Sequence, residues 1–306
     1  MGSIDISVLF STRNRARQLR DTLSHMERLE LNGLSLEVIA IDNGSSDDTR
    51  SVMEDSAKSL PLIALQEPEP GKNRALNRGL EVARGDLLVF TDDDVQPDAE
   101  WLLEFHGASR RWPDDGIFGG RIEPLVPPDA PDWIRSPDFD FAMIAYGKYA
   151  PSQEEGPTDA SPHGGNMAIR ASALGDMRYS EVIGPKGRNF AMGSETELLS
   201  RLRARGERCL YVPSARVNHV IESEQTTLEW LFGRVHRMGR GWARLNPQNG
   251  CAQLWGAPRY LWKQLAAAWI RHRASCCRSD SARFETGREY HKLRGIIHEY
   301  RLMSGG

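Results

Sequence analysis

The chain has 306 residues, of which 40% are hydrophobic and 26% are charged, with 28 glycines and 17 prolines. This is an ordinary globular composition with enough apolar material for a sizeable core, and it excludes a disordered, collagenous or coiled-coil chain. The formal net charge of −3 gives no reason to expect nucleic-acid binding.

Charge is distributed unevenly along the chain. Residues 223–306 carry 14 Lys and Arg against 6 Asp and Glu, a net charge of +8, together with five of the eight tryptophans. The residues before them carry 25 basic and 36 acidic side chains, a net charge of −11. Such an asymmetry predicts that the C-terminal part meets an anionic or interfacial partner.

Several features bear on where the protein works. The four cysteines have neither metal-ligand nor disulfide-framework spacing, which favours a reduced, cytoplasmic setting. The N-terminus lacks a basic region ahead of an apolar stretch, so we expect no signal peptide. The longest apolar runs, such as residues 265–270, are too short to cross a bilayer. We therefore expect a soluble or peripheral protein.

Short apolar runs alternate with helical patterns over the first ~120 residues, which predicts a parallel sheet covered by helices. The predicted strands are residues 4–11, 36–42, 62–66 and 87–91, and the predicted helices are 15–29, 47–59 and 73–84. Polar clusters follow three of these strands, at 11–14, 42–43 and 92–94. In open α/β sheets, ligands gather at the carboxyl ends of the strands.

The second half of the chain is less regular. Residues 124–162 are rich in Pro and Asp and predict a long surface loop, of a kind that is usually functional or mobile. We expect order to resume at residues 166–171, followed by a helix near 195–205 and a strand around 209–212. From residue 226 onward the pattern is helical, with interruptions at Pro247 and Pro258.

Asp92-Asp93-Asp94 is the strongest chemical signal. Three adjacent carboxylates repel one another, and a fold keeps them only where a cation or hydrogen-bond donors compensate. Hard oxygen ligands on a loop suit Mg²⁺ or Mn²⁺ shared with phosphate oxygens. Acids that merely decorate a turn or a helix start are the alternative, and the triplet by itself leaves both interpretations open.

The surroundings of the triplet resemble a known family. The pattern runs in order through Val8–Arg15, Val38–Thr49, Gly71–Asp86, Leu88–Asp94 and Trp101-Leu102. It resembles the inverting GT-A glycosyltransferases of family 2, over about residues 4–220. The resemblance implies an α/β, GT-A (Rossmann-like) fold with a mostly parallel sheet flanked by helices, to which the sequence adds a helical C-terminal extension.

The resemblance also implies that the chain is divided into parts with different functions. Residues 1–123 would form the nucleotide-sugar-binding half of the domain and residues 124–222 its acceptor and catalytic half. Residues 223–306 would be a basic, Trp-rich helical extension. The implied donor is a nucleotide-diphosphate sugar, and the implied cofactor is Mn²⁺ or Mg²⁺.

The family's site residues map onto this sequence position by position. Asp94 would bind the metal, and His219, after a strand that follows the catalytic helix, would lie near it. A diphosphate needs cationic neutralisation and a ribose diol needs an acceptor, which agrees with this assignment. The residues implied to bind the nucleotide sugar are Ser11, Thr12, Arg13, Asp42, Gly71, Lys72, Asn77, Asp92, Asp93, Gly165 and Asn166.

A second acidic site begins the helix predicted near residue 195. Ser194 and Glu197 have the spacing of a capping box, which explains Glu197 without a catalytic function. The resembling family has an acidic pair here, whose second member is the general base. In this chain Ser194 replaces the first member and Glu195 takes the place of the second. The resemblance thus implies Glu195 as the base, and a first-turn acid stabilised by the helix dipole is the alternative.

Three functions compete. The first is a metal-dependent inverting transfer of a sugar to an acceptor hydroxyl, in glycan or glycolipid synthesis. The second is a non-catalytic scaffold that binds nucleotide sugars, which Ser194 keeps open. The third is a sugar nucleotidyltransferase, which is disfavoured because no glycine-rich loop follows the first strand; a NAD-binding dehydrogenase fails for the same reason.

The C-terminal extension suggests a partner. Leu261, Trp262, Leu265 and Trp269 lie on one helical stripe among basic residues, a pattern typical of helices that lie on anionic membranes. Packing of this stripe on the protein's own core is the alternative. A second basic face could instead neutralise an acceptor diphosphate; it comprises Arg234, Arg237, Arg240 and Arg244. We expect a carbohydrate or lipid-linked acceptor, and a cytoplasmic enzyme that associates peripherally with the cytoplasmic face of a membrane.

Overall fold

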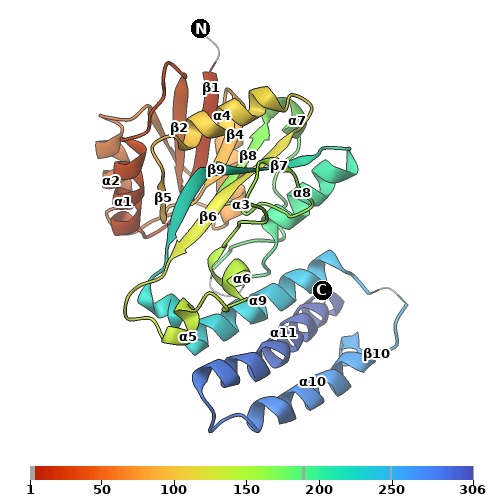
Figure 1. The fold of residues 1–306 in the computed structure, drawn as a ribbon. Helices are drawn as coiled ribbons and strands as arrows, with labels where there is room; N and C mark the ends of the chain where they lie inside the picture. The colour runs from red at the N-terminus through yellow and green to blue at the C-terminus, as the bar shows by residue number, and fades with distance from the viewer. Residues whose placement is uncertain (1–3, 188–189, 249, 306) are drawn as a thin grey trace. The chain divides into compact units, whose positions relative to one another are not determined.

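The computed structural model describes residues 4–187, 190–248 and 250–305. In these residues nine strands form one mixed sheet in the order β3-β2-β1-β4-β8-β6-β9-β5, with β7 paired to β9 (Figure 1). The strands are β1 (Ile4–Thr12), β2 (Leu36–Asp42), β3 (Leu62–Gln66), β4 (Gly85–Thr91), β5 (Val95–Pro97), β6 (Ile117–Leu125), β7 (Gly156–Pro157), β8 (Asn166–Arg170) and β9 (Cys209–Val220). The helices associated with the sheet are α1 (Ala16–Met26), α2 (Thr49–Ser56), α3 (Lys72–Leu80), α4 (Trp101–Arg111), α6 (Ala142–Tyr146), α7 (Ala171–Leu174) and α8 (Ser194–Ala204).

The N-terminal half of the sheet is parallel. β1 lies between β2 and β4, β3 pairs with β2, and α1, α2 and α3 connect the successive strands. β2 and β3 have the predicted bounds, because each is a short apolar run between turn residues; β2 is buried almost throughout, whereas β3 forms the partly exposed edge of the sheet. β8 and β5 then add antiparallel pairings. The predicted α/β class, with a helix-flanked sheet and C-terminal helices, is confirmed.

Each face of the sheet has its own apolar core, since successive side chains of a strand point to opposite faces. On one face, Val8 and Phe10 of β1 pack with residues of α1, α2 and α4, including Trp101. On the other, Leu9 of β1 and Phe90 of β4 pack with residues of α3, α7 and α8. Helices therefore cover both faces, and the strand ends are left as the place for polar chemistry.

The predicted loop at 124–162 is wrong in part. It contains α5 (Asp132–Arg135), α6 and β7, separated by irregular backbone. Aromatic side chains between its prolines and aspartates are buried, among them Phe141, Tyr146 and Tyr149. Burial of such large side chains contributes enough free energy to order a segment whose composition alone indicates a loop.

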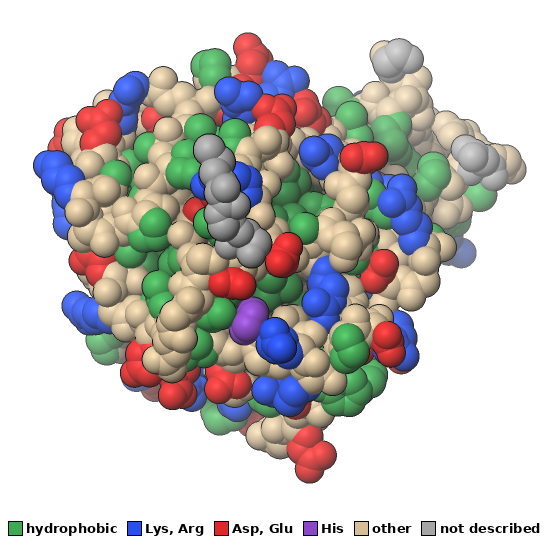
Figure 2. Space-filling view, turned by 90° about the horizontal axis from the view of Figure 1, so that it is seen from above, with side chains coloured by type: hydrophobic (Ala, Val, Ile, Leu, Met, Phe, Trp, Pro, Cys, Tyr) green, Lys and Arg blue, Asp and Glu red, His purple; other side chains and the backbone are tan. Residues whose placement is uncertain are grey.

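The chain forms two compact units. Unit 1 comprises Met1–Leu125, Phe141–Ser180 and Glu195–Ile221, and it contains the sheet. Unit 2 comprises Val126–Asp140, Glu181–Ser194 and Glu222–Gly306. Two internal segments thus group with the C-terminal helices, whereas the functional division into three consecutive parts stays a prediction. Over the surface that Figure 2 presents, acidic and basic side chains are interspersed, in keeping with the small net charge.

Unit 2 is mainly helical, with a short hairpin. Its elements are α5, the 3₁₀ helix η1 (Ser223–Thr226), α9 (Leu228–Leu245), β10 (Gln253–Leu254), β11 (Ala257–Pro258), α10 (Arg259–Arg273) and α11 (Asp280–Ser304). α9 and α11 approach closely at glycines: a Cβ added at Gly239 would lie 2.2 Å from the Lys292 carbonyl oxygen, and one at Gly295 would lie 2.0 Å from that of His236. Neither position has room for any side chain.

The internal segments of unit 2 are tied to these helices by aromatic rings and backbone contacts. Trp133 and Phe139 lie with ring centroids 5.5 and 5.9 Å from that of Phe284 in α11. The Met192 N–H donates to the Arg237 carbonyl oxygen at 3.2 Å. These contacts explain why sequence-distant stretches belong to one unit.

A buried carboxylate neutralises part of the predicted basic face. Glu299 has no exposed surface, and its Oε2 lies 2.5 Å from Arg240 Nε, while its Oε1 pairs with Arg244 Nε. Arg244 also donates to the carbonyl oxygen of Val182. The prediction that all four arginines of α9 form one face for an acceptor diphosphate is therefore wrong for Arg240 and Arg244.

The predicted stripe on α10 is divided. Leu261 is buried, and Trp262 and Leu265 pack beside it against the apolar core of α10 and α11. Trp269 is 48% exposed and the neighbouring Ile270 is 61% exposed. The alternative of internal packing thus holds for three residues of the stripe and not for Trp269. In the described part of the chain, no helix is long and apolar enough to span a membrane.

Candidate active site

Three polar loops meet at one edge of the sheet. Thr12, at the end of β1, lies opposite Asp42 at the end of the parallel strand β2. Asn14 has φ 52° and accepts a hydrogen bond from the Ser46 N–H at 2.7 Å, which joins the loops after these strands. Asp92–Asp94 directly follow β4, which is parallel to β1. The structure thus brings together the three polar clusters that the sequence places after strand ends.

A guanidinium and an ammonium group form ion pairs with the aspartate triplet. Arg15 Nη1 lies 3.0 Å from Asp93 Oδ1 and 2.5 Å from Asp94 Oδ2. Lys72 Nζ, from the first turn of α3, lies 2.5 Å from Asp92 Oδ1. The side chains of Asp93 and Asp94 are only 9% and 11% exposed, so their repulsion is poorly screened by water and the cations offset it.

His219 of β9 reaches the same cluster. Its Nε2 lies 3.4 Å from Asp94 Oδ1, and its Nδ1 donates to the carbonyl oxygen of Tyr146 at 2.7 Å. Because a carbonyl only accepts hydrogen bonds, Nδ1 carries a proton and Nε2 is directed at the carboxylate. Metal-binding histidines are commonly oriented by a backbone bond of this kind.

The pKa values within the cluster diverge because its groups are buried together. Burial and the Asp94 charge raise the pKa of Asp93 to about 6, against the opposing effect of Arg15. Burial would also raise the pKa of Asp94, but His219 and Arg15 outweigh it and hold that pKa well below its usual value. Asp94 in turn raises the pKa of His219 against the effect of burial. Asp94 is therefore the more firmly ionised of the two acids.

Asp94 and His219 are the part of the cluster that fits a divalent cation. Asp94 Oδ1 is buried and accepts no hydrogen bond from the described residues. A carboxylate oxygen beside an imidazole nitrogen is a donor set that suits Mn²⁺, and the carboxylate also suits Mg²⁺. Within residues 4–187, 190–248 and 250–305, no group of three or more His, Cys, Asp or Glu could hold a metal by itself. Phosphate oxygens would have to complete the coordination, as is usual where Mg²⁺ binds nucleotides.

Gly164 and Gly165 support two carboxylates that come from different elements. A Cβ added at Gly164 would lie 2.4 Å from Glu195 Oε1, and one added at Gly165 would lie 3.2 Å from Asp92 Oδ2. A side chain at residue 164 would therefore displace the Glu195 carboxylate. The charges of both acids act on Lys72. Burial lowers the pKa of Lys72, but Asp92 and Glu195 more than compensate, so that its pKa is raised. We call Gly164–Gly165 the glycine ledge.

The predicted capping box at the start of α8 does not form. Ser194 is already the first helical residue, and its buried hydroxyl has no hydrogen-bond partner among the described residues. Glu197 instead accepts two hydrogen bonds of 2.7 Å from Arg201, one turn later. A bidentate, charge-assisted partner is stronger than a single backbone N–H. Glu197 thus keeps a structural role, whereas Glu195 of the same turn faces the glycine ledge.

Two asparagines that were predicted to bind the nucleotide sugar form hydrogen bonds within the protein. Asn77 Nδ2 donates to the Tyr179 carbonyl oxygen at 2.9 Å, and the Tyr179 N–H donates back to Asn77 Oδ1 at 2.8 Å. Asn166 has no exposed surface; its Oδ1 accepts from Trp101 Nε1 at 2.7 Å, and its Nδ2 donates to two backbone carbonyls. The Asn166 side chain therefore joins elements of unit 1 and leaves no polar atom for a ligand in this structure.

The remaining predicted nucleotide contacts lie in the loops at the same edge. Asp42 is buried and accepts from the Ser45 N–H at 2.8 Å. Gly71, with φ 149°, begins the turn into α3 in a conformation that favours glycine. Ser11 is half-buried, Thr12 is buried and Arg13 is exposed.

Sequence reasoning missed Arg15 and Asn43. The left-handed Asn14 turns the chain between Arg13 and Arg15, so that Arg15 rather than Arg13 reaches the triplet. Asn43 Oδ1 accepts from the Gly71 N–H at 2.8 Å, and its Nδ2 donates to two carbonyls in the loop before α3. The sequence did contain a signal for Asn43, because this amide directly follows an apolar strand. No sequence feature distinguishes Arg15 from the neighbouring Arg13.

The polar loops lie within a segment that matches a known family. A family model described as glycosyl transferase family 2 matches residues 7–178, more than half of the chain. The chain belongs to this family. The matched span of this family 2 member includes the polar loops after β1, β2 and β4, the aspartate triplet and the glycine ledge. The family resemblance predicted from the sequence is confirmed.

Named relatives of this family 2 chain agree. Succinoglycan biosynthesis protein ExoM of Rhizobium meliloti is 26% identical over 246 residues, which cover 79% of this chain and 76% of that protein. Glucosyl-dolichyl phosphate glucuronosyltransferase of Haloferax volcanii is 23% identical over 211 residues, which cover 67% of this chain and 65% of that enzyme. The enzyme is therefore a family 2 glycosyltransferase, and neither the scaffold nor the nucleotidyltransferase alternative is supported.

A solved structure confirms the GT-A fold. Mannosyltransferase PcManGT from Pyrobaculum calidifontis, in complex with GDP-Man and Mn²⁺, has a TM-score of 0.62 and 18% identity. The alignment covers 98% of this chain and 88% of that one. At such low identity the likeness concerns the fold alone.

Proposed function

We propose that this glycosyltransferase catalyses a metal-dependent, inverting transfer from a nucleotide-diphosphate sugar to an acceptor hydroxyl. The observation that carries the proposal is the glycine ledge. It places the carboxylate of Glu195 beside Gly164 and that of Asp92 beside Gly165, so that a base and the acidic cluster flank one small space. An in-line displacement requires a general base for the attacking hydroxyl on one side of the sugar. On the other side it requires groups that neutralise the charge of the leaving diphosphate.

The donor would bind along the polar edge of the sheet. Asp42 and Asp92 offer acceptors for the base and the ribose diol, with Thr12 and Gly71 in the flanking loops. Lys72 and Arg15 bring positive charge next to the triplet, where a diphosphate would lie.

Asp94 and His219 would hold the divalent cation, with Asp92 close by. When bound, Mn²⁺ or Mg²⁺ would neutralise the charge that develops on the leaving diphosphate. The chain's own contribution is to keep Asp94 ionised and to aim Nε2 of His219 at its Oδ1 through the Tyr146 carbonyl. The first coordination sites are thus pre-organised before any donor arrives.

Glu195 would act as the general base. It would take the proton of the acceptor hydroxyl while that oxygen attacks the anomeric carbon. The bond from this carbon to the diphosphate oxygen breaks, and its electron pair stays with the diphosphate. Attack occurs on the face opposite the leaving group, so the configuration at the anomeric carbon inverts.

The acceptor would be a carbohydrate or a lipid-linked glycan. The name of the Haloferax volcanii relative includes a glucosyl-dolichyl phosphate, and the Rhizobium meliloti relative serves succinoglycan biosynthesis. Unit 2 offers a surface for such an acceptor: Trp269 and Ile270 of α10 are exposed, as are the basic residues Lys263 and Arg271 of the same helix. We propose that this face of α10 associates reversibly with an anionic membrane, on its cytoplasmic side.

A donor panel tests the function. Purified protein is incubated with nucleotide-diphosphate sugars, with Mn²⁺ or with EDTA, and release of the nucleoside diphosphate is measured. We expect release from at least one donor with Mn²⁺ and none with EDTA, and the anomeric configuration of the product, read by NMR, should be inverted. Nucleotide binding without turnover of any donor would refute catalysis, and retained configuration would refute the role of Glu195.

A further inference from the structure

Arg15 occupies the oxygen of Asp94 that is not turned to His219. Arg15 Nη1 lies 2.5 Å from Asp94 Oδ2, whereas His219 Nε2 lies 3.4 Å from Asp94 Oδ1. The same guanidinium nitrogen lies 3.0 Å from Asp93 Oδ1. A positive side chain of the protein thus stands where Asp94 would offer its second oxygen to a divalent cation.

The backbone of Arg15 is fixed, but its side chain can change partner. The Arg15 N–H donates to Thr49 Oγ1 at 3.0 Å, and the Arg15 carbonyl oxygen accepts from the Leu19 N–H at 2.9 Å. The side chain is 37% exposed, so it is open to solvent. Among the described residues, Nη1 is the guanidinium nitrogen that has acidic partners. Nε and Nη2 are left for a phosphate, which a guanidinium group binds in bidentate fashion.

Arg15 also sets the charge of the cluster before a ligand binds. The three carboxylates of Asp92–Asp94 face two cations, Arg15 and Lys72, so that one negative charge remains. Addition of a divalent cation to the unchanged cluster would reverse the sign of this charge. Water would screen the excess poorly, because the side chains of Asp93 and Asp94 are only 9% and 11% exposed. A metal ion alone is therefore opposed, whereas a metal ion together with a diphosphate is not.

The metal ligands favour the same order of events. In the part of the chain that the structure describes, no group of three or more His, Cys, Asp or Glu could hold a metal ion. Asp94 and His219 thus need phosphate oxygens to complete a coordination shell. Asp94 can offer both of its oxygens only after Arg15 has left Oδ2.

We propose that Arg15 is an exchangeable counter-ion, which pairs with Asp94 in the free enzyme and with the donor diphosphate in the loaded one. In the free enzyme its guanidinium weakens the affinity of Asp94 for a divalent cation. When donor and cation bind together, the guanidinium leaves Asp94 Oδ2, pairs with the diphosphate and keeps Asp93 as its second partner. The inference rests on the function proposed above, and it names the residue that couples metal binding to donor binding.

Titration of the full-length protein with Mn²⁺ alone, with free Mn²⁺ read by electron paramagnetic resonance, tests the first half of the exchange. Arg15→Gln should bind Mn²⁺ at least about tenfold more tightly than the natural chain, because Asp94 Oδ2 becomes free and the cluster more negative. Arg15→Lys keeps the charge and should stay within about threefold of the natural chain. Circular dichroism checks that both variants fold. Unchanged or weaker Mn²⁺ binding in Arg15→Gln would overturn the proposal.

The second half is tested with nucleoside diphosphates in saturating Mn²⁺, using UDP, GDP, CDP, ADP and dTDP as probes. The probe that the natural chain binds should bind Arg15→Gln at least about tenfold more weakly, because the diphosphate loses its guanidinium partner. Mn²⁺ and the nucleotide thus respond in opposite directions, whereas damage to the fold would weaken both. Nucleotide affinity within about twofold of that of the natural chain would refute the exchange.

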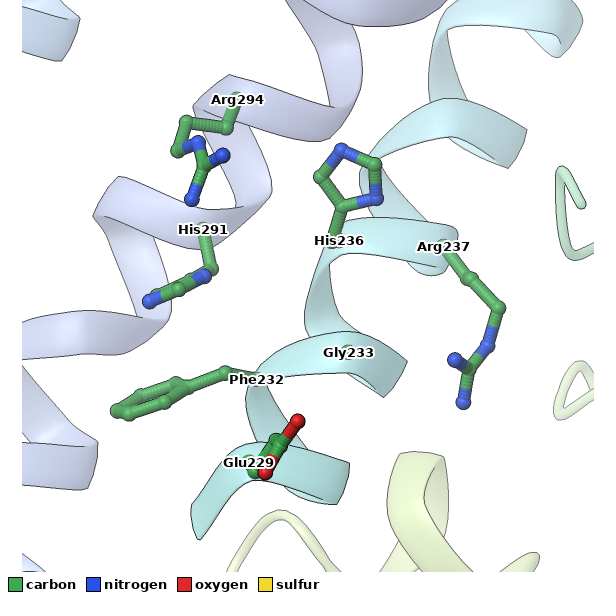
Figure 3. A pocket seen from close by; sticks show the side chains of 7 residues that line it. All are labelled: Glu229, Phe232, Gly233, His236, Arg237, His291 and Arg294. Carbon is green, nitrogen blue, oxygen red and sulfur yellow. The ribbon is translucent and has the colours of Figure 1, made fainter. Parts of the chain in front are cut away.

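Arg237→Gln is the matched control for loss of a positive charge. Arg237 is half-buried like Arg15, but it belongs to unit 2, where it lines a hollow of about 390 Å³ (Figure 3). Its Cζ lies 5.4 Å from the ring centroid of Phe190. Both affinities should change less than about twofold in this variant. Equal changes in Arg15→Gln and Arg237→Gln would assign the effect to net charge and contradict the proposal.

Turnover separates this inference from the function on which it rests. Release of nucleoside diphosphate that EDTA abolishes, with Mn²⁺ bound equally by Arg15→Gln and the natural chain, would refute the exchange and leave metal-dependent transfer standing. Release by the natural chain that is indifferent to EDTA would refute the metal dependence, and the exchange with it.

Discussion

Buried charge is balanced in different ways in the two units. In unit 1, Arg15, Lys72 and His219 surround three carboxylates, and these cations remain partly exposed. In unit 2 the relation is reversed, since Arg240 and Arg244 converge on Glu299, which has no exposed surface.

The difference separates two uses of an ion pair. In a partly exposed ion pair, the cation can leave its carboxylate and bind a ligand, because a phosphate or water then takes the place of the carboxylate. A pair sealed from solvent cannot exchange, because either group would be left desolvated and unpaired. The comparison therefore predicts that changes in unit 1 affect catalysis and that changes at Glu299 affect stability.

The largest effect is expected at Glu195. Glu195→Gln should lower kcat by at least ~10²-fold with little change in the unfolding free energy, because it removes the proton acceptor and preserves the shape. Single-turnover kinetics and nucleotide binding separate this from a loss of donor affinity. Glu197→Gln, two residues along the same helix, serves as the control and should retain kcat within about tenfold. A reversed order would assign the base to Glu197.

Asp94→Asn should come next. The variant loses the carboxylate charge beside His219 and half of the charge that balances Arg15, so Mn²⁺-dependent donor binding should weaken by about 10²-fold. Titration of donor with and without Mn²⁺ measures this. Asp98→Asn removes one acidic charge four residues along, where Asp98 pairs with the half-exposed Arg216, and should change the metal dependence little. Unaltered Mn²⁺ dependence in Asp94→Asn would refute the metal assignment.

Glu299→Gln should act on stability alone. Removal of this sealed carboxylate takes away the counter-charge that Glu299 gives to the buried Arg240, which costs about 3–5 kcal/mol of unfolding free energy. Urea denaturation of the variant gives this value. Glu285→Gln, whose side chain is 57% exposed in its pair with Arg288, should cost less than about 1 kcal/mol. Similar costs for both would contradict the contrast between sealed and exposed pairs.

Acid should weaken unit 2 through His236 and His291. Their pKa values are lowered to about 4 in the folded chain, below the ~6.5 of an unfolded one. The unfolded state thus binds more protons between pH 6.5 and pH 4, so stability is full above this window and falls as pH is lowered through it. Because both rings are partly exposed, the loss should be only roughly 1 kcal/mol. Urea midpoints of His236→Gln/His291→Gln should fall less between pH 7 and pH 4.5 than those of the natural chain.

The smallest effect is expected at the membrane. Trp269→Ser should weaken co-sedimentation with anionic vesicles by about tenfold with little change in stability, because 48% of this residue is exposed. Met143→Ser, an equally exposed apolar site in unit 1, is the control and should leave vesicle binding unchanged. Equal binding to neutral and anionic vesicles, or none to either, would leave α10 without a membrane role.

Much of the fold was predictable, because its parallel strands are short apolar runs between turn residues. Parts of the site were predictable for the same reason: Asp92–Asp94 directly follow such a strand, and Asp42 ends another. The selection of Arg15 over Arg13 was not, since it depends on the left-handed Asn14 between them. Pairing of Arg240 and Arg244 with Glu299 was also hidden, because the partner lies more than fifty residues away on another helix.

Unit 2 is assembled from stretches that are far apart in the chain, and this has a consequence for how the protein is made. Trp133 and Phe139 leave the ribosome on the order of 10 s before Phe284, at ~5–20 residues per second. Until then they lack the ring of α11 on which they pack. A chain that stops before Asp280 would lack the contact of these rings with Phe284, which would leave them more accessible to chaperones or proteases. Completion of the last helix is therefore a checkpoint in biosynthesis for residues translated much earlier.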